Sequence, residues 1–361
     1  MESAVDTGWR KVLEHDPTHE SGSNGPLASI IIPFYNRSEL LWETLDCVKN
    51  QTHSPLELIL IDDGSEDDIA SDIKASLEAF GEKWMLVRMD KNQGPGKARK
   101  LGHQLAAGKY LQFLDSDDII SPEKLKLQVG FLEDHPEVIM TYALTRYMDE
   151  GETAPEQRVL GRTDQDFNRI LPHVIPRMIW QTSSCLWRSS AVSPDFWKPL
   201  YGPEDVLFDF YAGLADKPVA RTPGDKVLLY KRVDESGISH GIGLNPAYQQ
   251  EILKYFDYVH AECVNNKKLD SNLIRRIMDF QAQKYANKIT TFLNFRRVPE
   301  VEHCIRMVRE INGRFLPPDV RISLLINRIF KTYVGFTFLR KWRWVKKLTY
   351  RKIKSMFNSP R

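Results

Sequence analysis

The sequence has few cysteines and no long apolar run. Its four cysteines, at positions 47, 185, 263 and 304, are too scattered to form a zinc site. A chain of 361 residues with 42% hydrophobic content is large enough to bury a core without disulfides. No signal-peptide pattern opens the chain, and no stretch reaches the ~18 apolar residues that span a bilayer. We therefore expect reduced thiols, a cytoplasmic location and, at most, peripheral contact with a membrane.

Acidic residues are absent from one end of the chain. Between Val320 and Arg361 there are twelve Lys or Arg and no Asp or Glu, whereas 38 basic and 48 acidic residues precede this segment. Residues 331–361 also carry two tryptophans and other apolar side chains. This composition is typical of an amphipathic helix in the headgroup plane of an anionic membrane, which would place the protein at the inner face of the cell membrane. A basic helix packed on the acidic body, or one that binds RNA nonspecifically, is the alternative, and no specific nucleic acid is expected.

The sequence also lacks the glycine-rich turn with which dehydrogenases bind a dinucleotide. The first predicted strand ends in Pro33-Phe34-Tyr35-Asn36-Arg37, without a G-x-G-x-x-G pattern, which disfavours hydride transfer. The same segment has no basic loop that would grip a phosphate. A nucleotidyltransferase therefore remains a weaker alternative.

Apolar runs and amphipathic helical patterns alternate through the first third of the chain. Buried strands are predicted at 28–34, 56–61, 85–89 and 110–114. The helices between them have apolar faces formed by Leu41, Leu45 and Val48, by Ile69, Ile73 and Leu77, and by Ala98, Leu101 and Leu105. This rhythm predicts an α/β fold with a mainly parallel central sheet flanked by helices, in which ligands bind beyond the carboxyl ends of the strands.

Composition divides the chain into four predicted parts. The boundaries that we expect are 1–26 for a flexible leader, 27–240 for the α/β domain, 241–330 for a helical appendage and 331–361 for the basic, aromatic tail.

Three carboxylates gather directly after the strand at 110–114, in the run Asp115-Ser116-Asp117-Asp118. Like charges in a partly buried place raise one another's pKa values unless a cation neutralises them, and carboxylate oxygens suit Mg²⁺ or Mn²⁺. A divalent ion bound to a diphosphate is the occupant that this pattern predicts. The alternative is that Asp117 and Asp118 only cap the helix that follows Pro122.

Two further loops follow predicted strands. Asp62 and Asp63 precede a glycine and could accept hydrogen bonds from a base and ribose hydroxyls, or could form only a strand-to-helix turn. The loop 92–99 opens a helix with two glycines and two cations, and it could face a diphosphate. Trp180 precedes another strand-like run, where it serves either as a platform for an acceptor sugar or as part of the core.

Four motifs together resemble a known family. In order along the chain they are Ser29-Ile30-Ile31-Ile32-Pro33-Phe34-Tyr35-Asn36-Arg37, Ile61-Asp62-Asp63-Gly64-Ser65, Asn92-x-Gly94-x-x-x-Ala98-Arg99 and Phe113-Leu114-Asp115-Ser116-Asp117-Asp118. This series is similar to the family-2 glycosyltransferases of the GT-A fold over roughly residues 27–235. Lys100 departs mildly from the family, which often has Asn there.

The resemblance implies an inverting transfer of a sugar from a nucleoside diphosphate sugar, usually a UDP-sugar, to a hydroxyl of a glycan or lipid-linked acceptor in surface polysaccharide assembly. The donor-binding residues expected on this basis are Pro33, Tyr35, Asp62, Asp63, Gly94, Arg99, Asp115, Ser116 and Asp117. The expected metal ligands for Mn²⁺ or Mg²⁺ are Asp115, Asp117 and His240, the last in a loop that follows the final strand.

The same resemblance extends to Gly202-Pro203-Glu204-Asp205, an acidic pair that opens a helix. It implies that Asp205 is the general base, and Glu204 beside it is assigned to the acceptor. The helix dipole favours the charged carboxylate and should keep the basicity of Asp205 modest, while the alternative for both acids is simple first-turn placement. From another class of function, a noncatalytic, membrane-docked scaffold that binds nucleotide without turnover is also considered.

Overall fold

The computed structural model describes residues 8–16, 25–36, 38–66, 69–148, 159–175, 178–232, 245–267, 269–295 and 297–312. Its contacts divide the chain into two compact units, Met1–Ile242 and Gly243–Arg361, a division that lies beside the boundary expected at residue 240. The predicted metal ligand His240 and the predicted membrane-binding tail 331–361 lie outside the described residues.

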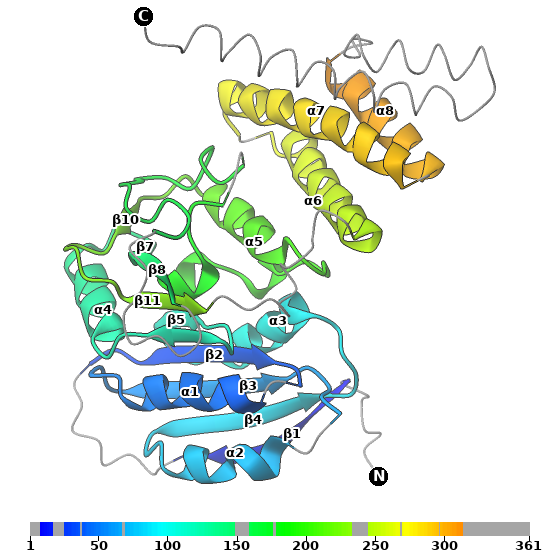
Figure 1. Ribbon diagram of the computed structural model, residues 1–361. Coiled ribbons are helices and arrows are strands. Elements are labelled where there is room, and N and C mark those ends of the chain that lie inside the picture. Colours follow the sequence, from blue (N-terminus) through cyan, green and yellow to red (C-terminus); the bar gives the residue numbers. More distant parts are fainter. Residues whose placement is uncertain are drawn as a thin grey trace, which may run out of the picture. The chain divides into compact units, whose positions relative to one another are not determined.

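An eight-stranded sheet forms the centre of the first unit (Figure 1). Its strands, in spatial order, are β1 (Trp9–His15), β4 (Lys83–Met89), β3 (Leu56–Asp62), β2 (Ala28–Phe34), β5 (Tyr110–Phe113), β9 (Cys185–Arg188), β7 (Met140–Tyr142) and β10 (Val219–Arg221). The four strands β4, β3, β2 and β5 are parallel, β7 and β10 are parallel, and β1 and β9 pair antiparallel with their neighbours. The predicted α/β fold with a mainly parallel sheet is confirmed.

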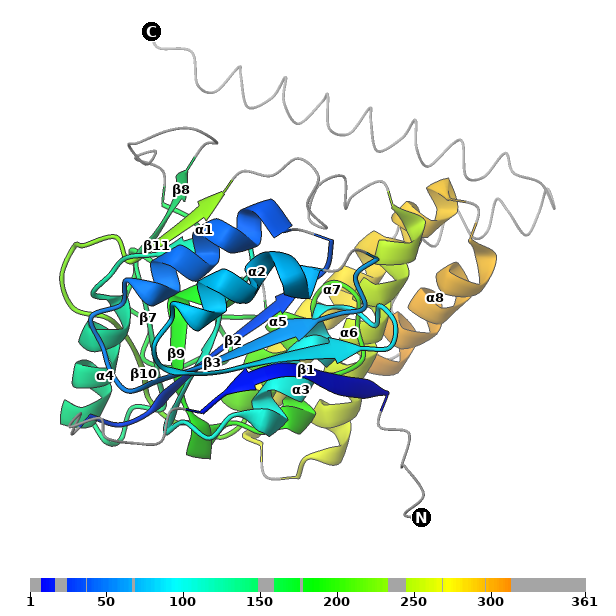
Figure 2. The ribbon, with the colours of Figure 1, turned by 90° about the horizontal axis from the view of Figure 1, so that it is seen from below.

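Helices cover both faces of this sheet. They are α1 (Ser38–Lys49), α2 (Ile69–Glu78), α3 (Pro95–Leu105), α4 (Lys124–Asp134) and α5 (Glu204–Gly213), with short 3₁₀ turns η1 (Thr182–Ser184), η2 (Ser189–Ala191) and η3 (Pro194–Phe196). Alternate side chains of a strand point to opposite faces. Thus Ile30 packs in one core with Leu41 of α1, whereas Ile31 meets α3, where a Cβ on Gly102 would lie 2.3 Å from its Cγ2 atom. Figure 2 shows α1 and α2 on one side of the sheet and α3 on the other.

A second, three-stranded sheet supports the turn that carries the acidic motif. It consists of β6 (Asp118–Ile120), β11 (Leu229–Arg232) and β8 (Thr145–Met148), in the order β6-β11-β8. Strand β11 runs antiparallel to β6 and parallel to β8. The register places Lys231 directly opposite Asp118.

Two expectations need correction. Residues 9–15 are not a loose leader, because they form β1, an edge strand whose pairing with β4 is built largely from exposed residues and so leaves no buried apolar run to detect. Asp118 does not cap the following helix, because it begins β6, while α4 starts at Lys124 with Glu123 as its cap residue.

The second unit is helical, as predicted. Its described elements are α6 (Pro246–Asn265), α7 (Ser271–Asn294) and α8 (Val298–Asn312). Helix α6 begins with Pro246, and the Asn245 side chain accepts hydrogen bonds from the next two free backbone N–H groups. Within the described parts of the chain, no helix is both long and apolar enough to cross a membrane.

Candidate functional site

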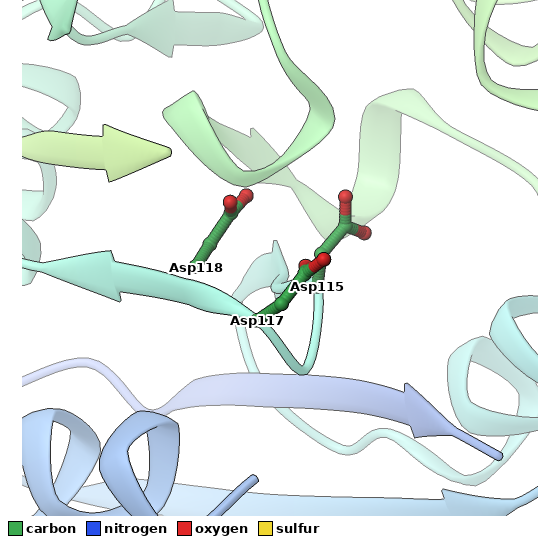
Figure 3. Close-up of side chains that lie close together, drawn as sticks. All are labelled: Asp115, Asp117 and Asp118. Carbon is green, nitrogen blue, oxygen red and sulfur yellow. The ribbon is translucent and has the colours of Figure 1, made fainter. Parts of the chain in front are cut away.

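The three aspartates of the acidic motif lie together at the turn between β5 and β6 (Figure 3). One oxygen from each of Asp115, Asp117 and Asp118 can be chosen so that all three lie within 4.8 Å of one another. The backbone N–H of Asp115 donates to Ser183 Oγ at 3.0 Å, which fixes the turn against η1. The carboxylates therefore form a compact group of oxygens of the kind that a divalent cation prefers.

Asp118 is the most deeply placed of the three. Its side chain is fully buried, Lys231 Nζ lies 3.3 Å from its Oδ1, and its Oδ2 has no hydrogen-bond partner among the described residues. Burial raises the pKa of Asp118 to about 7, Lys231 opposes this rise, and the charges of Asp115 and Asp117 add to it. A buried oxygen without a partner is costly unless a ligand satisfies it, so the cluster fits a bound Mg²⁺ or Mn²⁺.

Arg99 connects this cluster to helix α5. Its Nη2 donates to Asp115 Oδ1 at 2.6 Å and its Nη1 donates to Glu204 Oε1 at 2.8 Å, while the guanidinium lies 5.4 Å from the Trp197 ring centroid. Burial alone would lower the pKa of Arg99, but the nearby carboxylates raise it, so the side chain stays charged. The sequence predicts Arg99 at the nucleotide, and in the structure its guanidinium lies between the carboxylates of Asp115 and Glu204.

Glu204 has an internal role that the sequence did not predict. It is 4% exposed, its Oε1 accepts from Arg99, and its Oε2 accepts from the backbone N–H of Gly202 at 3.0 Å. Burial and then the charge of Asp205 raise its pKa to about 7, which Arg99 partly offsets. Glu204 therefore anchors Arg99, and the acceptor contact expected of Glu204 stays a prediction.

Asp205, the predicted base, follows Glu204 in the first turn of α5. Its Oδ1 accepts from the backbone N–H of Val206 at 2.7 Å, and Thr182 Oγ1 lies 3.5 Å from its Oδ2. Burial raises its pKa, Arg99 lowers it, and Asp115 raises it further, so the net direction is upward. The modest basicity expected from the helix dipole is thus outweighed by desolvation, which makes Asp205 a better proton acceptor.

The two acidic residues after β3 hold their own loops in place. Asp63 accepts from the backbone N–H groups of Gln93 and Gly94, at 2.8 and 2.7 Å. Asp62 accepts from the N–H of Ser65 at 2.8 Å. Asp63 therefore fixes the loop that opens α3, and donor contact by Asp62 and Asp63 stays a prediction.

The remaining donor-site residues lie at the carboxyl ends of neighbouring parallel strands, as the sequence predicts. Pro33 is buried near the end of β2, and Tyr35 beyond it is 37% exposed. Gly94 has φ +88°, and a Cβ there would lie 2.9 Å from the Tyr201 ring, so the position favours glycine. Ser116 is buried, and its carbonyl accepts from Thr44 Oγ1 at 3.0 Å.

Trp180 is not an acceptor platform. It is 1% exposed, its Nε1 donates to Asp209 Oδ2 at 2.8 Å, and its ring centroid lies 4.8 Å from that of Tyr142. A ring buried in the core cannot stack on a sugar, so the core alternative is correct. Asp209 itself escaped sequence analysis, although an acid four residues after Asp205 on an apolar helix was a signal; burial and then Asp205 raise its pKa well above the usual range.

Comparison with known proteins agrees with these observations. Residues 29–185 match the family described as Glycosyl transferase family 2, which confirms the sequence resemblance. An uncharacterized glycosyltransferase of Rickettsia bellii is 40% identical over 124 residues, covering 34% of this chain but 18% of the relative. The putative teichuronic acid biosynthesis glycosyltransferase TuaG of Bacillus subtilis is 36% identical over 107 residues, covering 30% of this chain and 42% of the relative. The aligned part thus spans less than half the length of either protein.

Solved structures show the same fold. TarS 1–349 of S. aureus, in complex with UDP-GlcNAc, superimposes with a TM-score of 0.62 at 18% identity and covers 88% of this chain and 92% of its own. The mannosyltransferase PcManGT from Pyrobaculum calidifontis, in complex with GDP-Man and Mn²⁺, has a TM-score of 0.50 at 16% identity and covers 90% and 85%. These likenesses confirm the GT-A type of fold.

Proposed function

We propose that this protein transfers a sugar from a nucleoside diphosphate sugar to a hydroxyl of a glycan or lipid-linked acceptor, with inversion, because residues 29–185 match the family described as Glycosyl transferase family 2. Residues up to about 240 form the catalytic domain in this proposal, and 241–330 a helical appendage. The observation that carries it is the cluster of Asp115, Asp117 and Asp118, with a buried oxygen that has no partner among the described residues. Structural neighbours solved with UDP-GlcNAc or GDP-Man support the class of donor.

The acidic cluster would hold the Mn²⁺ or Mg²⁺. Asp115 and Asp117 are the more exposed of the three carboxylates and can face a diphosphate, while Asp118 supports them from below. A divalent ion bound there would stabilise negative charge on the departing diphosphate. Arg99 donates to Oδ1 of Asp115 and Lys231 Nζ lies 3.8 Å from its Oδ2, so a metal would compete with both cations for this carboxylate.

Asp205 is the base in this proposal. It would accept the proton of the acceptor hydroxyl as that oxygen attacks the anomeric carbon from the face opposite the leaving group. Its raised pKa suits this task. Arg99 joins Asp115 to Glu204, the residue before the base, so one buried guanidinium fixes the spacing between the metal-binding turn and the base-bearing helix.

The cellular setting follows from weaker support. TuaG is named for teichuronic acid biosynthesis, which favours surface polysaccharide assembly as the pathway. The basic, aromatic composition of 331–361 favours attachment to an anionic membrane at its cytoplasmic face, close to a lipid-linked acceptor.

Calorimetric titration of UDP tests the donor site. We expect binding that requires Mn²⁺ in the parent protein and that is lost in the Asp115→Ala/Asp117→Ala variant, whereas Asp216→Ala, whose side chain is 84% exposed, should behave like the parent. Asp205→Asn should bind UDP with Mn²⁺ normally but transfer sugar about 10²–10⁴-fold more slowly. Absence of UDP binding in the parent would refute the donor assignment. If the parent bound UDP but transferred no sugar, and Asp205→Asn behaved in the same way, the noncatalytic scaffold would be favoured.

A further inference from the structure

A lysine already occupies the edge of the acidic cluster. Lys231 lies on β11, in register with Asp118 on β6, and its Nζ is 3.3 Å from Asp118 Oδ1 and 3.8 Å from Asp115 Oδ2. Its side chain is 22% exposed. The ammonium therefore touches two of the three carboxylates that would hold a divalent ion.

The charge of Lys231 is stable. A lysine side chain is an ammonium at neutral pH, and the carboxylates of Asp115 and Asp118 beside it favour that charged form. The three carboxylates carry about three negative charges when ionised, and among the described residues Arg99 and Lys231 are the cations paired with them. The cluster is thus partly neutralised before any metal arrives.

A divalent ion that enters the cluster meets this ammonium at close range. The two positive charges repel each other, and this repulsion is much stronger in a partly buried site than in water because the effective dielectric constant there is lower. Asp115 and Asp118 cannot fully serve both cations. An anionic diphosphate beside the metal would remove this conflict. Its oxygens can accept hydrogen bonds from the Lys231 ammonium in place of those of the aspartates.

We propose that Lys231 is an internal counter-ion that stabilises the metal-free acidic cluster and weakens the binding of a divalent ion alone, so that the ion binds tightly only together with a nucleoside diphosphate. This role rests on the proposed donor site. It makes Lys231 a positioning residue that sets the coupling between metal and donor, and it gives β11 a function beyond that of a supporting strand.

The test uses the full chain and measures binding of Mn²⁺ alone, by calorimetry and by the electron paramagnetic resonance signal of free Mn²⁺. Lys231→Gln keeps a hydrogen-bond donor for Asp118 but removes the charge, and Lys231→Met removes both. We expect each to bind Mn²⁺ without nucleotide at least about tenfold more tightly than the parent, equivalent to ~1.4 kcal/mol. Lys231→Arg keeps the charge and should resemble the parent.

Lys226→Met is the matched control, because Lys226 pairs with Glu123 on the surface and its side chain is 56% exposed. By linkage, the factor by which UDP tightens Mn²⁺ binding should fall in Lys231→Gln as the affinity for Mn²⁺ alone rises. The role of Lys231 would be overturned if Lys231→Gln bound Mn²⁺ alone no more tightly than the parent does. If the parent still bound Mn²⁺ together with UDP, the proposed donor site would be unaffected by that result. Failure of the parent to bind Mn²⁺ even with UDP would overturn the donor site itself. Should Lys231→Met not fold, Lys231→Gln alone decides.

Discussion

Replacing Arg99 with methionine should destabilise the protein strongly, because it removes the cation between two carboxylates. Methionine preserves much of the apolar stem of the side chain but removes the guanidinium that lies over the Trp197 ring, so the change is mainly one of charge. Loss of one partner of a buried ion pair costs about 3–5 kcal/mol, since the other charge is left uncompensated. Glu204 is 4% exposed and carries most of this penalty, whereas Asp115 is partly exposed and remains near Lys231. We therefore expect a loss of about 3 kcal/mol in the free energy of unfolding at pH 8.

The loss should depend on pH with a definite sign. In the parent, the pKa of Glu204 is raised to about 7, and Arg99 is one of the groups that restrain this rise. Without Arg99 the folded-state pKa rises further above the unfolded value of 4.5, so the folded state favours protonated Glu204. A group of this kind stabilises the fold at low pH and loses that contribution as pH rises through its folded pKa. The difference between parent and Arg99→Met should consequently be smaller at pH 5 than at pH 8.

Urea unfolding followed by tryptophan fluorescence measures this effect, since six of the eight tryptophans lie between positions 9 and 197, in the first unit. Arg169→Met is the control: Arg169 pairs with Asp216, whose side chain is 84% exposed, and its loss should cost no more than about 1 kcal/mol. A loss below about 1 kcal/mol for Arg99→Met at pH 8, or an equal loss at pH 5 and pH 8, would refute the argument that a buried carboxylate is left unpaired.

Two other substitutions probe the supporting structure. Gly64→Ala should lower the free energy of unfolding in urea more than Gly224→Ala does. Both glycines have positive φ, but a Cβ on Gly64 would lie 2.6 Å from the Lys91 backbone carbon, whereas a Cβ on Gly224 would meet nothing within 4 Å. Equal losses in the two variants would contradict this reasoning. Burial lowers the pKa of Lys124 from 10.5 to about 7, so above about pH 7 the unfolded chain holds a proton that the folded chain has released. The free energy of unfolding of the parent should therefore rise between about pH 7 and pH 10, and Lys124→Met should abolish this rise. A parallel rise in parent and Lys124→Met would show that this lysine is not its source.

The elements that can be predicted well from the sequence are those in which the polarity of each residue matches its own burial. Strand β2 is buried at every position and is apolar without interruption from Ile30 to Phe34, and the repeated apolar residues of α1 mark the face that packs on it. What sequence analysis missed depends on pairing across long separations. The bond between Arg99 and Glu204 joins residues 105 positions apart in the sequence, and Lys231 contacts Asp118 across 113 positions. At such separations the sequence around one partner does not indicate the other. Trp180 illustrates a different limit, because an indole suits both a sugar and a core.

Strand β1 has a consequence for the solution behaviour of the protein. Without it, the seven residues of β4, Lys83–Met89, would present an unpaired backbone edge beside a strongly apolar strand, which is a template for association with another chain. The strand that covers this edge carries the charged, exposed pair Lys11 and Glu14, and its register shifts between Lys11 and Leu13. Charge and a bulge are two devices that make a sheet edge unattractive to further strands. Residues 9–15 thus protect one edge of the sheet from pairing with other chains, and β10 forms the opposite edge.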